Sequence, residues 1–122
     1  MQYLVDVRYP EHRKTTVTAD ELPDAYAGLK EADSPSVVWN DGGDDVLIVV
    51  VGDDHAVISL KSEETWYYLT VSGDEEEVEV DMGGTDSYVP RKALAPRELG
   101  LTVLQRAGDL PGLRTDYSWD EQ

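Results

Sequence analysis

The chain of 122 residues contains no cysteine and no phenylalanine. Without cysteine, disulfide bonds and thiolate metal sites are excluded. No segment approaches the roughly 20 consecutive apolar residues that a membrane-spanning helix needs, so we expect no membrane partner. The first residues, Met1 to Asp6, also lack the basic start and the apolar stretch of a secretory signal peptide. We therefore expect a cytoplasmic protein.

Cations are scarce. The chain has 10 Lys and Arg residues against 26 Asp and Glu residues, a net charge of −16. Free nucleic acid and anionic membranes repel such a chain, whereas basic proteins attract it. Acidity of this kind is also typical of halophilic or merely very soluble proteins. The charge is concentrated, however, because residues 41–86 hold fourteen acids and a single base, Lys61. Solubility alone does not require that segregation.

One domain, residues 1–122, accounts for the whole length. Hydrophobic alternation predicts strands near 2–9 and 15–17, a brief pairing at Tyr88 and Val89, and a final short strand over 113–119. Between them, an antiparallel meander is predicted over residues 37–39, 46–51, 55–60, 65–71 and 76–82. The 46–51 strand is apolar at every position, so we expect it to be central and covered on both faces.

Two helices complete the predicted α+β fold, a mostly antiparallel meander sheet with one helix near each terminus. The first is opened by Thr18 and Glu21, which have the spacing of a capping box, and it runs to about Ala32. The second begins at Pro96 and stops at Gly108. Gly100 weakens this second helix by up to about 1 kcal/mol relative to alanine.

A predicted hairpin gathers charge on one face of the meander. Gly73-Asp74 has the form of a two-residue turn, and it joins strand 65–71 to strand 76–82. This register places Trp66 and Tyr68 on the same face as three carboxylates, whereas the other face is apolar.

Carboxylates accept forked hydrogen bonds from arginine, and aromatic rings attract cations. The charged face of the hairpin is therefore a candidate partner-binding surface, extended by acids in the flanking turns. The alternative is that both aromatic residues pack in the core while the acids face water. The predicted partner-binding residues are Trp66, Tyr68, Glu77, Glu79, Asp81, Asp53, Asp54 and Glu75.

Residues suited to catalysis or metal binding form no recognisable pattern. His12 lies in a charged turn and His55 begins a strand beside Asp53 and Asp54, and neither histidine belongs to a recognisable catalytic motif with a Ser or Asp partner. The acidic turns lack the spacing of an EF-hand. Neither Gly42-Gly43 nor Gly83-Gly84 precedes a helix, as a phosphate-binding loop does. We expect a non-enzymatic protein with no metal and no cofactor.

The order of these features resembles the first-numbered immunity protein family of bacterial polymorphic toxin systems. The resemblance covers nearly the full length. It rests first on the helix opened by Thr18 and on the aromatic strand Thr65-Trp66-Tyr67-Tyr68. Further along, Tyr88-Val89-Pro90 precedes a helix. At the end of the chain, Gly108, Pro111 and Trp119 are similar to the family's Gly-x-x-Pro and final Trp. The chain departs from the pattern by having no Phe, by Gly100 inside the last helix, and by two extra residues after Gly108.

The resemblance implies a small, non-catalytic protein that binds and blocks a cognate toxin, often encoded next to it. We accordingly expect an immunity-like protein, monomeric or weakly dimeric, that occludes a basic active-site surface. Two alternatives stay open. One is a small-molecule-binding or accessory protein of a biosynthetic gene cluster, with a pocket around Trp39, Trp66 and Tyr68. The other is a subunit that dimerises through an uncovered sheet face.

Overall fold

Ten strands hold just under half of the residues of the computed structural model, which describes residues 1–122. The strands are β1 (Gln2–Val7), β2 (Arg13–Thr18), β3 (Pro35–Asn40), β4 (Val46–Val51), β5 (His55–Ser62), β6 (Thr65–Thr70), β7 (Glu77–Asp81), β8 (Asp86–Pro90), β9 (Leu94–Pro96) and β10 (Ser118–Glu121). The helices are α1 (Leu22–Ala27), α2 (Arg97–Gln105) and α3 (Leu110–Asp116), with short 3-10 turns η1 (Glu31–Asp33) and η2 (Arg91–Ala93). The fold is α+β with a mostly antiparallel sheet, as predicted, but it has three helices instead of two.

The main sheet is antiparallel throughout, with the spatial order β10-β6-β5-β4-β3-β1-β2. β9 pairs with the first residues of β5. β3 to β6 form the predicted meander, and β4 lies at the centre of the sheet, as its unbroken apolar sequence indicates.

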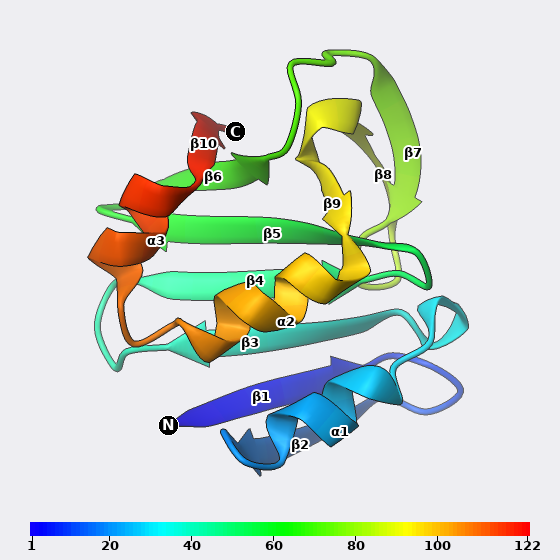
Figure 1. The fold of residues 1–122 in the computed structure, drawn as a ribbon. Helices are drawn as coiled ribbons and strands as arrows, with labels where there is room; N and C mark the ends of the chain where they lie inside the picture. The colour runs from blue at the N-terminus through cyan, green and yellow to red at the C-terminus, as the bar shows by residue number, and fades with distance from the viewer.

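One face of the sheet carries the main core. The registers place Tyr3, Val37, Val49, Ile58 and Leu69 on this face. Helices α1, α2 and α3 lie in front of it (Figure 1) and enclose a cluster of 19 buried residues. Burial of each large apolar side chain contributes about 1.5–3 kcal/mol, so this layer supplies most of the stability.

The opposite face is covered only at one end. There the β7–β8 hairpin packs Val80 and Val89 against Val57 of β5, with Val50 and Tyr68 at the margin. Figure 1 shows this hairpin beside β9, at the end of the sheet where β5 begins. The expectation that β4 is covered on both faces therefore holds only in part, because its residues alternate between buried and half-buried.

Helix α1 begins as predicted and ends early. The backbone N–H of Thr18 donates to the Glu21 carboxylate (2.9 Å), and the N–H of Glu21 donates to the Thr18 hydroxyl (3.3 Å). The helix stops at Ala27 instead of Ala32. Its last carbonyls are taken by a side chain, because the Arg97 guanidinium donates to the carbonyl oxygens of Tyr26 (2.8 Å) and Leu29 (2.9 Å).

The strand predicted over residues 113–119 is wrong, since most of that segment is helix α3. Asp109 caps this helix by accepting a hydrogen bond from the Gly112 N–H (3.1 Å), and Pro111 lies in the first turn. Both features are typical of helix starts. Only the last residues form a strand, β10, in which Trp119 pairs with Leu69 of β6.

The predicted hairpin between β6 and β7 is also wrong. A strand has two edges, and those of β6 are taken by β5 and by β10. β7 pairs instead with β8, which brings Val78 opposite Val89. Gly73 and Asp74 belong to a longer loop over residues 71–76, not to a two-residue turn.

Candidate functional site

The outer face of the β7–β8 hairpin carries the row of carboxylates that the sequence predicts. Val78 and Val80 point toward β5, so the alternate residues of β7 point away from it. The register sets Glu79 opposite Tyr88 and Asp81 opposite Asp86. We call this surface the acidic face, and it consists of Glu77, Glu79, Asp81, Asp86 and Tyr88.

The cross-strand pairs of the acidic face bring their side chains close together. Met82 and Thr85 are joined by a backbone hydrogen bond (2.8 Å), as are Glu76 and Arg91 (2.7 Å). Since hydrogen-bonded and non-hydrogen-bonded pairs alternate in an antiparallel ladder, Glu79–Tyr88 and Asp81–Asp86 are non-hydrogen-bonded pairs, whose side chains approach most closely.

Two carboxylates thus face each other at one end of the acidic face. Like charges directly opposite on neighbouring strands are destabilising. Asp81 is partly compensated, because the Ser34 hydroxyl and the Gly84 N–H (2.8 Å) both donate to its carboxylate. Asp86 is exposed and has no such donor. A cationic group placed between the two would relieve their repulsion.

Negative charge on the acidic face is not neutralised within the chain. Ion pairs involve eight of the protein's carboxylates, and none of the eight belongs to this face. Tyr88 lies among these acids with 65% of its surface exposed, the highest value among the large hydrophobic residues. An exposed aromatic ring surrounded by unpaired carboxylates is chemically suited to contact lysine and arginine side chains.

Trp66 and Tyr68 do not belong to the acidic face. They lie on the sheet face opposite the helices, where Trp66 is paired with Lys61 and Tyr68 with Ser59 of β5. Tyr68 packs at the margin of the small cluster under the hairpin, and its burial raises the pKa of its hydroxyl. The hairpin therefore brings the predicted acids together with a different aromatic residue.

Acids of the flanking turns are dispersed. Asp53 connects the β4–β5 turn to η1, because its N–H donates to the Glu31 carboxylate (3.2 Å) and its own carboxylate accepts from the Glu31 N–H (3.0 Å). Asp54 is exposed beside it. Glu75 lies at the other end of the hairpin and binds Lys92 (2.5 Å). Glu75 is thus neutralised, whereas Asp54 stays free.

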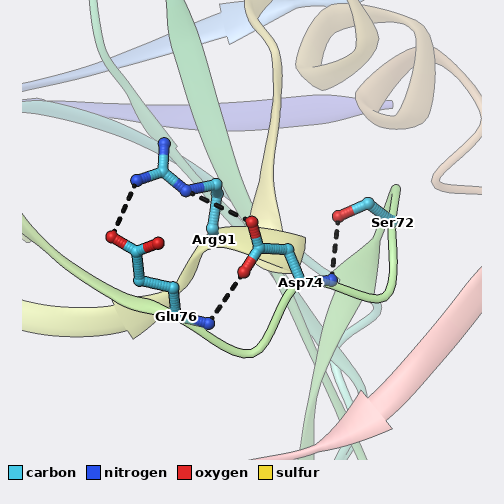
Figure 2. A network of polar contacts seen from close by, with 4 residues as sticks. All are labelled: Ser72, Asp74, Glu76 and Arg91. Atoms are coloured by element: carbon cyan, nitrogen blue, oxygen red, sulfur yellow. Dashed lines mark hydrogen bonds and ion pairs between the residues drawn. The ribbon is translucent and has the colours of Figure 1, made fainter.

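The loop before β7 is held by a polar network (Figure 2). Arg91 contacts the carboxylates of Asp74 (3.5 Å) and Glu76 (3.2 Å), while the Asp74 carboxylate accepts from the Glu76 N–H (2.9 Å). The Ser72 hydroxyl accepts from the Asp74 N–H (3.3 Å). The network engages Arg91, the base that directly follows β8, with carboxylates of the loop. Arg8 packs beside Gly84 in the hairpin turn but forms no ion pair with the acidic face.

Lys92 anchors the same loop to the C-terminal strand. Its ammonium group binds Asp120 (2.6 Å) as well as the loop carboxylate described above. These hydrogen bonds, the one to Asp120 first, raise the pKa of Lys92. The base of the hairpin is therefore fixed to both neighbouring segments.

Tyr88 is the residue that the sequence-based prediction missed. Its signal is the alternation of Asp86, Tyr88 and Pro90 with the apolar partner Val89, a half-buried strand pattern. That pattern predicts which face of the strand each residue lies on, but it does not predict that β8 pairs with β7.

Other candidate sites are less developed. Trp39 is buried on the helix side of the sheet, so it lines no pocket with Trp66 and Tyr68. A groove of about 200 Å³ lies between α1 and α2, next to Tyr26 and Arg97. No three His, Asp or Glu side chains are arranged to hold a metal ion.

Comparison with known proteins gives no relative: no family model matches the chain, and no curated protein does. No helix here combines the length and the apolar character needed to cross a bilayer.

Proposed function

We propose that this protein is an immunity-like inhibitor that binds a basic surface of a toxin through its acidic face and thereby occludes the toxin's active site. The observation that carries the proposal is the exposed ring of Tyr88 among carboxylates that have no cationic partner. The resemblance to the immunity family supports the same reading. The protein acts by binding and carries out no chemistry.

Charge and shape have separate tasks in this proposal. The carboxylates attract a basic partner over a distance and speed association in a salt-dependent manner. The tyrosine supplies buried contact area, and tyrosine is among the residues that most often dominate binding energy. Toxins that act on nucleic acid have basic clefts, which an acidic hairpin fits.

The test compares two triple variants with the same change in net charge. One replaces Glu77, Glu79 and Asp86 with lysine on the acidic face. The control replaces Asp44, Glu63 and Glu64 with lysine at the opposite end of the meander, where the β3–β4 and β5–β6 turns lie side by side. None of these six residues forms an ion pair.

Calorimetry with the toxin domain encoded beside this chain measures the affinity. We expect the acidic-face variant to lose most of its binding and the control to keep it, with a smaller salt dependence in both. Tyr88→Ala should weaken binding about 30-fold, the effect of losing about 2 kcal/mol at a hot spot. Equal losses in the two triple variants would mean that only net charge matters, and the proposal would be wrong.

A small-molecule-binding accessory protein is the alternative. The groove beside α1 and α2 is smaller than the roughly 300–1,000 Å³ of typical ligand pockets. The guanidinium of Arg97 is also engaged there, because it donates to three backbone carbonyls including that of Gly52 (2.8 Å). A more open depression of about 310 Å³ beside Leu4, Thr16 and Val38 only reaches the lower end of that range. A thermal shift with a metabolite panel would favour this alternative if it revealed a stabilising ligand.

A further inference from the structure

The β2 strand forms a free edge of the main sheet. It ends the strand order at the side opposite β10, and no element lies beyond it in Figure 1. All of its residues except Val17 are exposed. No proline and no bulge interrupts its pairing with β1. Free edges of this kind pair readily with another strand unless something prevents it.

The backbone groups available at this edge can be identified. Ala19 donates its N–H to the Met1 carbonyl (3.2 Å). Because inward and outward groups alternate along an edge strand, those of Lys14, Thr16 and Thr18 point away from β1. Thr18 is already engaged in the capping box, through its N–H and through its carbonyl. The free groups are therefore the N–H and C=O of Lys14 and Thr16.

Charge along this edge is self-complementary. The bases Arg13 and Lys14 begin β2, and the acids Asp20 and Glu21 follow its end. A second strand with the same sequence, laid antiparallel, sets the basic end of each copy beside the acidic end of the other. Two-fold symmetry requires this kind of self-complementary surface.

We propose that the occupant of the β2 edge is a second copy of this chain, paired antiparallel about a two-fold axis at Thr15. In this register Lys14 of each copy lies opposite Thr16 of the other, and Thr15 lies opposite Thr15. All the free backbone groups identified above are then used, in four hydrogen bonds between the copies. A shift by two residues in one direction sets Lys14 opposite Thr18, whose groups are occupied. A shift in the other direction sets Lys14 opposite Lys14 and Thr16 opposite His12, which lies outside β2.

The overall negative charge does not prevent this pairing. Residues 1–40 carry a net charge of only −3, and the strongly acidic segment 41–86 begins two strands away. The other edge of the sheet, β10, is shorter, with the acids Asp120 and Glu121, and charged residues on an edge discourage pairing. Lys14 is charged as well, but in the proposed register it lies opposite Thr16 of the other copy and not opposite a like charge. The proposed pairing uses residues of β2 only, and none of these belongs to the acidic face, so the dimer and the proposed function are tested by different variants.

Sedimentation of a dilution series tests the dimer at physiological salt, where repulsion between exposed charges is screened. Thr15→Asp sets two carboxylates opposite each other across the axis, whereas Thr15→Asn keeps the shape without the charge. Wild type and Thr15→Asn should form the same concentration-dependent dimer, and Thr15→Asp should dissociate about tenfold more readily or further, as facing like charges do. A wild type that is monomeric throughout, or equal behaviour of the two variants, overturns the proposal.

Amide hydrogen exchange gives a second readout on the wild-type chain. The N–H groups of Lys14 and Thr16 should become protected as the concentration rises. Those of Thr15 and Val17, which point toward β1, should be protected at every concentration. If Lys14 and Thr16 exchange at a rate independent of concentration, the strands do not pair as proposed, whatever the sedimentation shows.

Discussion

Replacing Gly100 with alanine should destabilise the protein, although the same change in an exposed helix is stabilising by roughly 1 kcal/mol. Gly100 is buried in α2, where the helix packs on β4 and β5. An added Cβ would lie 2.8 Å from Cγ1 of Val49 and 3.2 Å from Cβ of Ala56, and it would overlap the hydroxyl oxygen of Tyr26. The glycine that weakens α2 as a helix thus allows α2 to approach the sheet.

The Tyr26 side chain has little freedom to move aside. Its hydroxyl donates to the Arg97 carbonyl (2.6 Å), and the Arg97 guanidinium lies 5.3 Å from the centre of its ring. Burial raises the pKa of this hydroxyl to about 12. Overpacking costs about 1–3 kcal/mol and a broken hydrogen bond about 1 kcal/mol, against the roughly 1 kcal/mol of helix propensity gained. The net loss in unfolding free energy is therefore about 1–3 kcal/mol.

Urea unfolding of the wild type and of Gly100→Ala measures this loss, provided that the slope with urea is unchanged. Tyr26→Phe removes the obstructing hydroxyl, so Gly100→Ala should cost less in that background, a coupling that a double-mutant cycle detects. A variant Gly100→Ala that unfolds at a higher urea concentration than the wild type would refute the reasoning, because it would mean that α2 does not lie this close to the sheet.

Two other changes test local electrostatics. The Thr18 N–H and hydroxyl hold the pKa of Glu21 below its ordinary 4.5, so the stabilisation is present above pH 4.5 and is lost as the pH falls through the lowered pKa. In Glu21→Gln, the free energy of unfolding measured in urea should depend less on pH below 4.5. An unchanged pH dependence would mean that other carboxyl groups cause the loss of stability in acid. Asp86→Asn removes one of the two facing carboxylates, and it should stabilise the fold by about 0.2–1 kcal/mol while weakening toxin binding. A lower melting temperature would contradict the repulsion with Asp81.

Features encoded within a few residues were predictable. Alternation predicts β1 and the strands of the meander, and the spacing of Thr18 and Glu21 predicts the reciprocal hydrogen bonds that open α1. The start of α2 after Pro96 follows from the same kind of local rule. The start of α3 was encoded as well, by Asp109 and Pro111, but the apolar alternation before Trp119 obscured it.

Strand partners depend on competition between distant segments, and this is why the β6–β7 hairpin was predicted wrongly. Gly73-Asp74 suits a tight turn, but β10 lies about fifty residues further along the chain and takes the edge of β6. Trp119 favours that outcome, since it packs against the main core and donates its indole N–H to the Leu113 carbonyl (3.1 Å). The local sequence of β6 does not indicate whether β7 or β10 pairs with it.

The candidate site shows the same division. The side-chain face of a strand is a local property, so Glu77 and Glu79 share a face whichever strand lies beside them. The residue across from Glu79 depends on the pairing, and it changes from Tyr68 to Tyr88 when β8 replaces β6. The carboxylates were therefore predictable from the sequence, whereas their aromatic neighbour was not.

General acidity and a binding surface make different demands on the chain. Solubility is served by carboxylates anywhere on the surface and favours neither an exposed aromatic ring nor facing like charges. The acidic face has both, in Tyr88 and in the pair Asp81–Asp86, while Arg91 is engaged by the loop close by. Asp86→Asn distinguishes general acidity from a binding surface. If the variant is more stable to unfolding but binds the toxin more weakly, the Asp86 carboxylate serves binding and destabilises the fold.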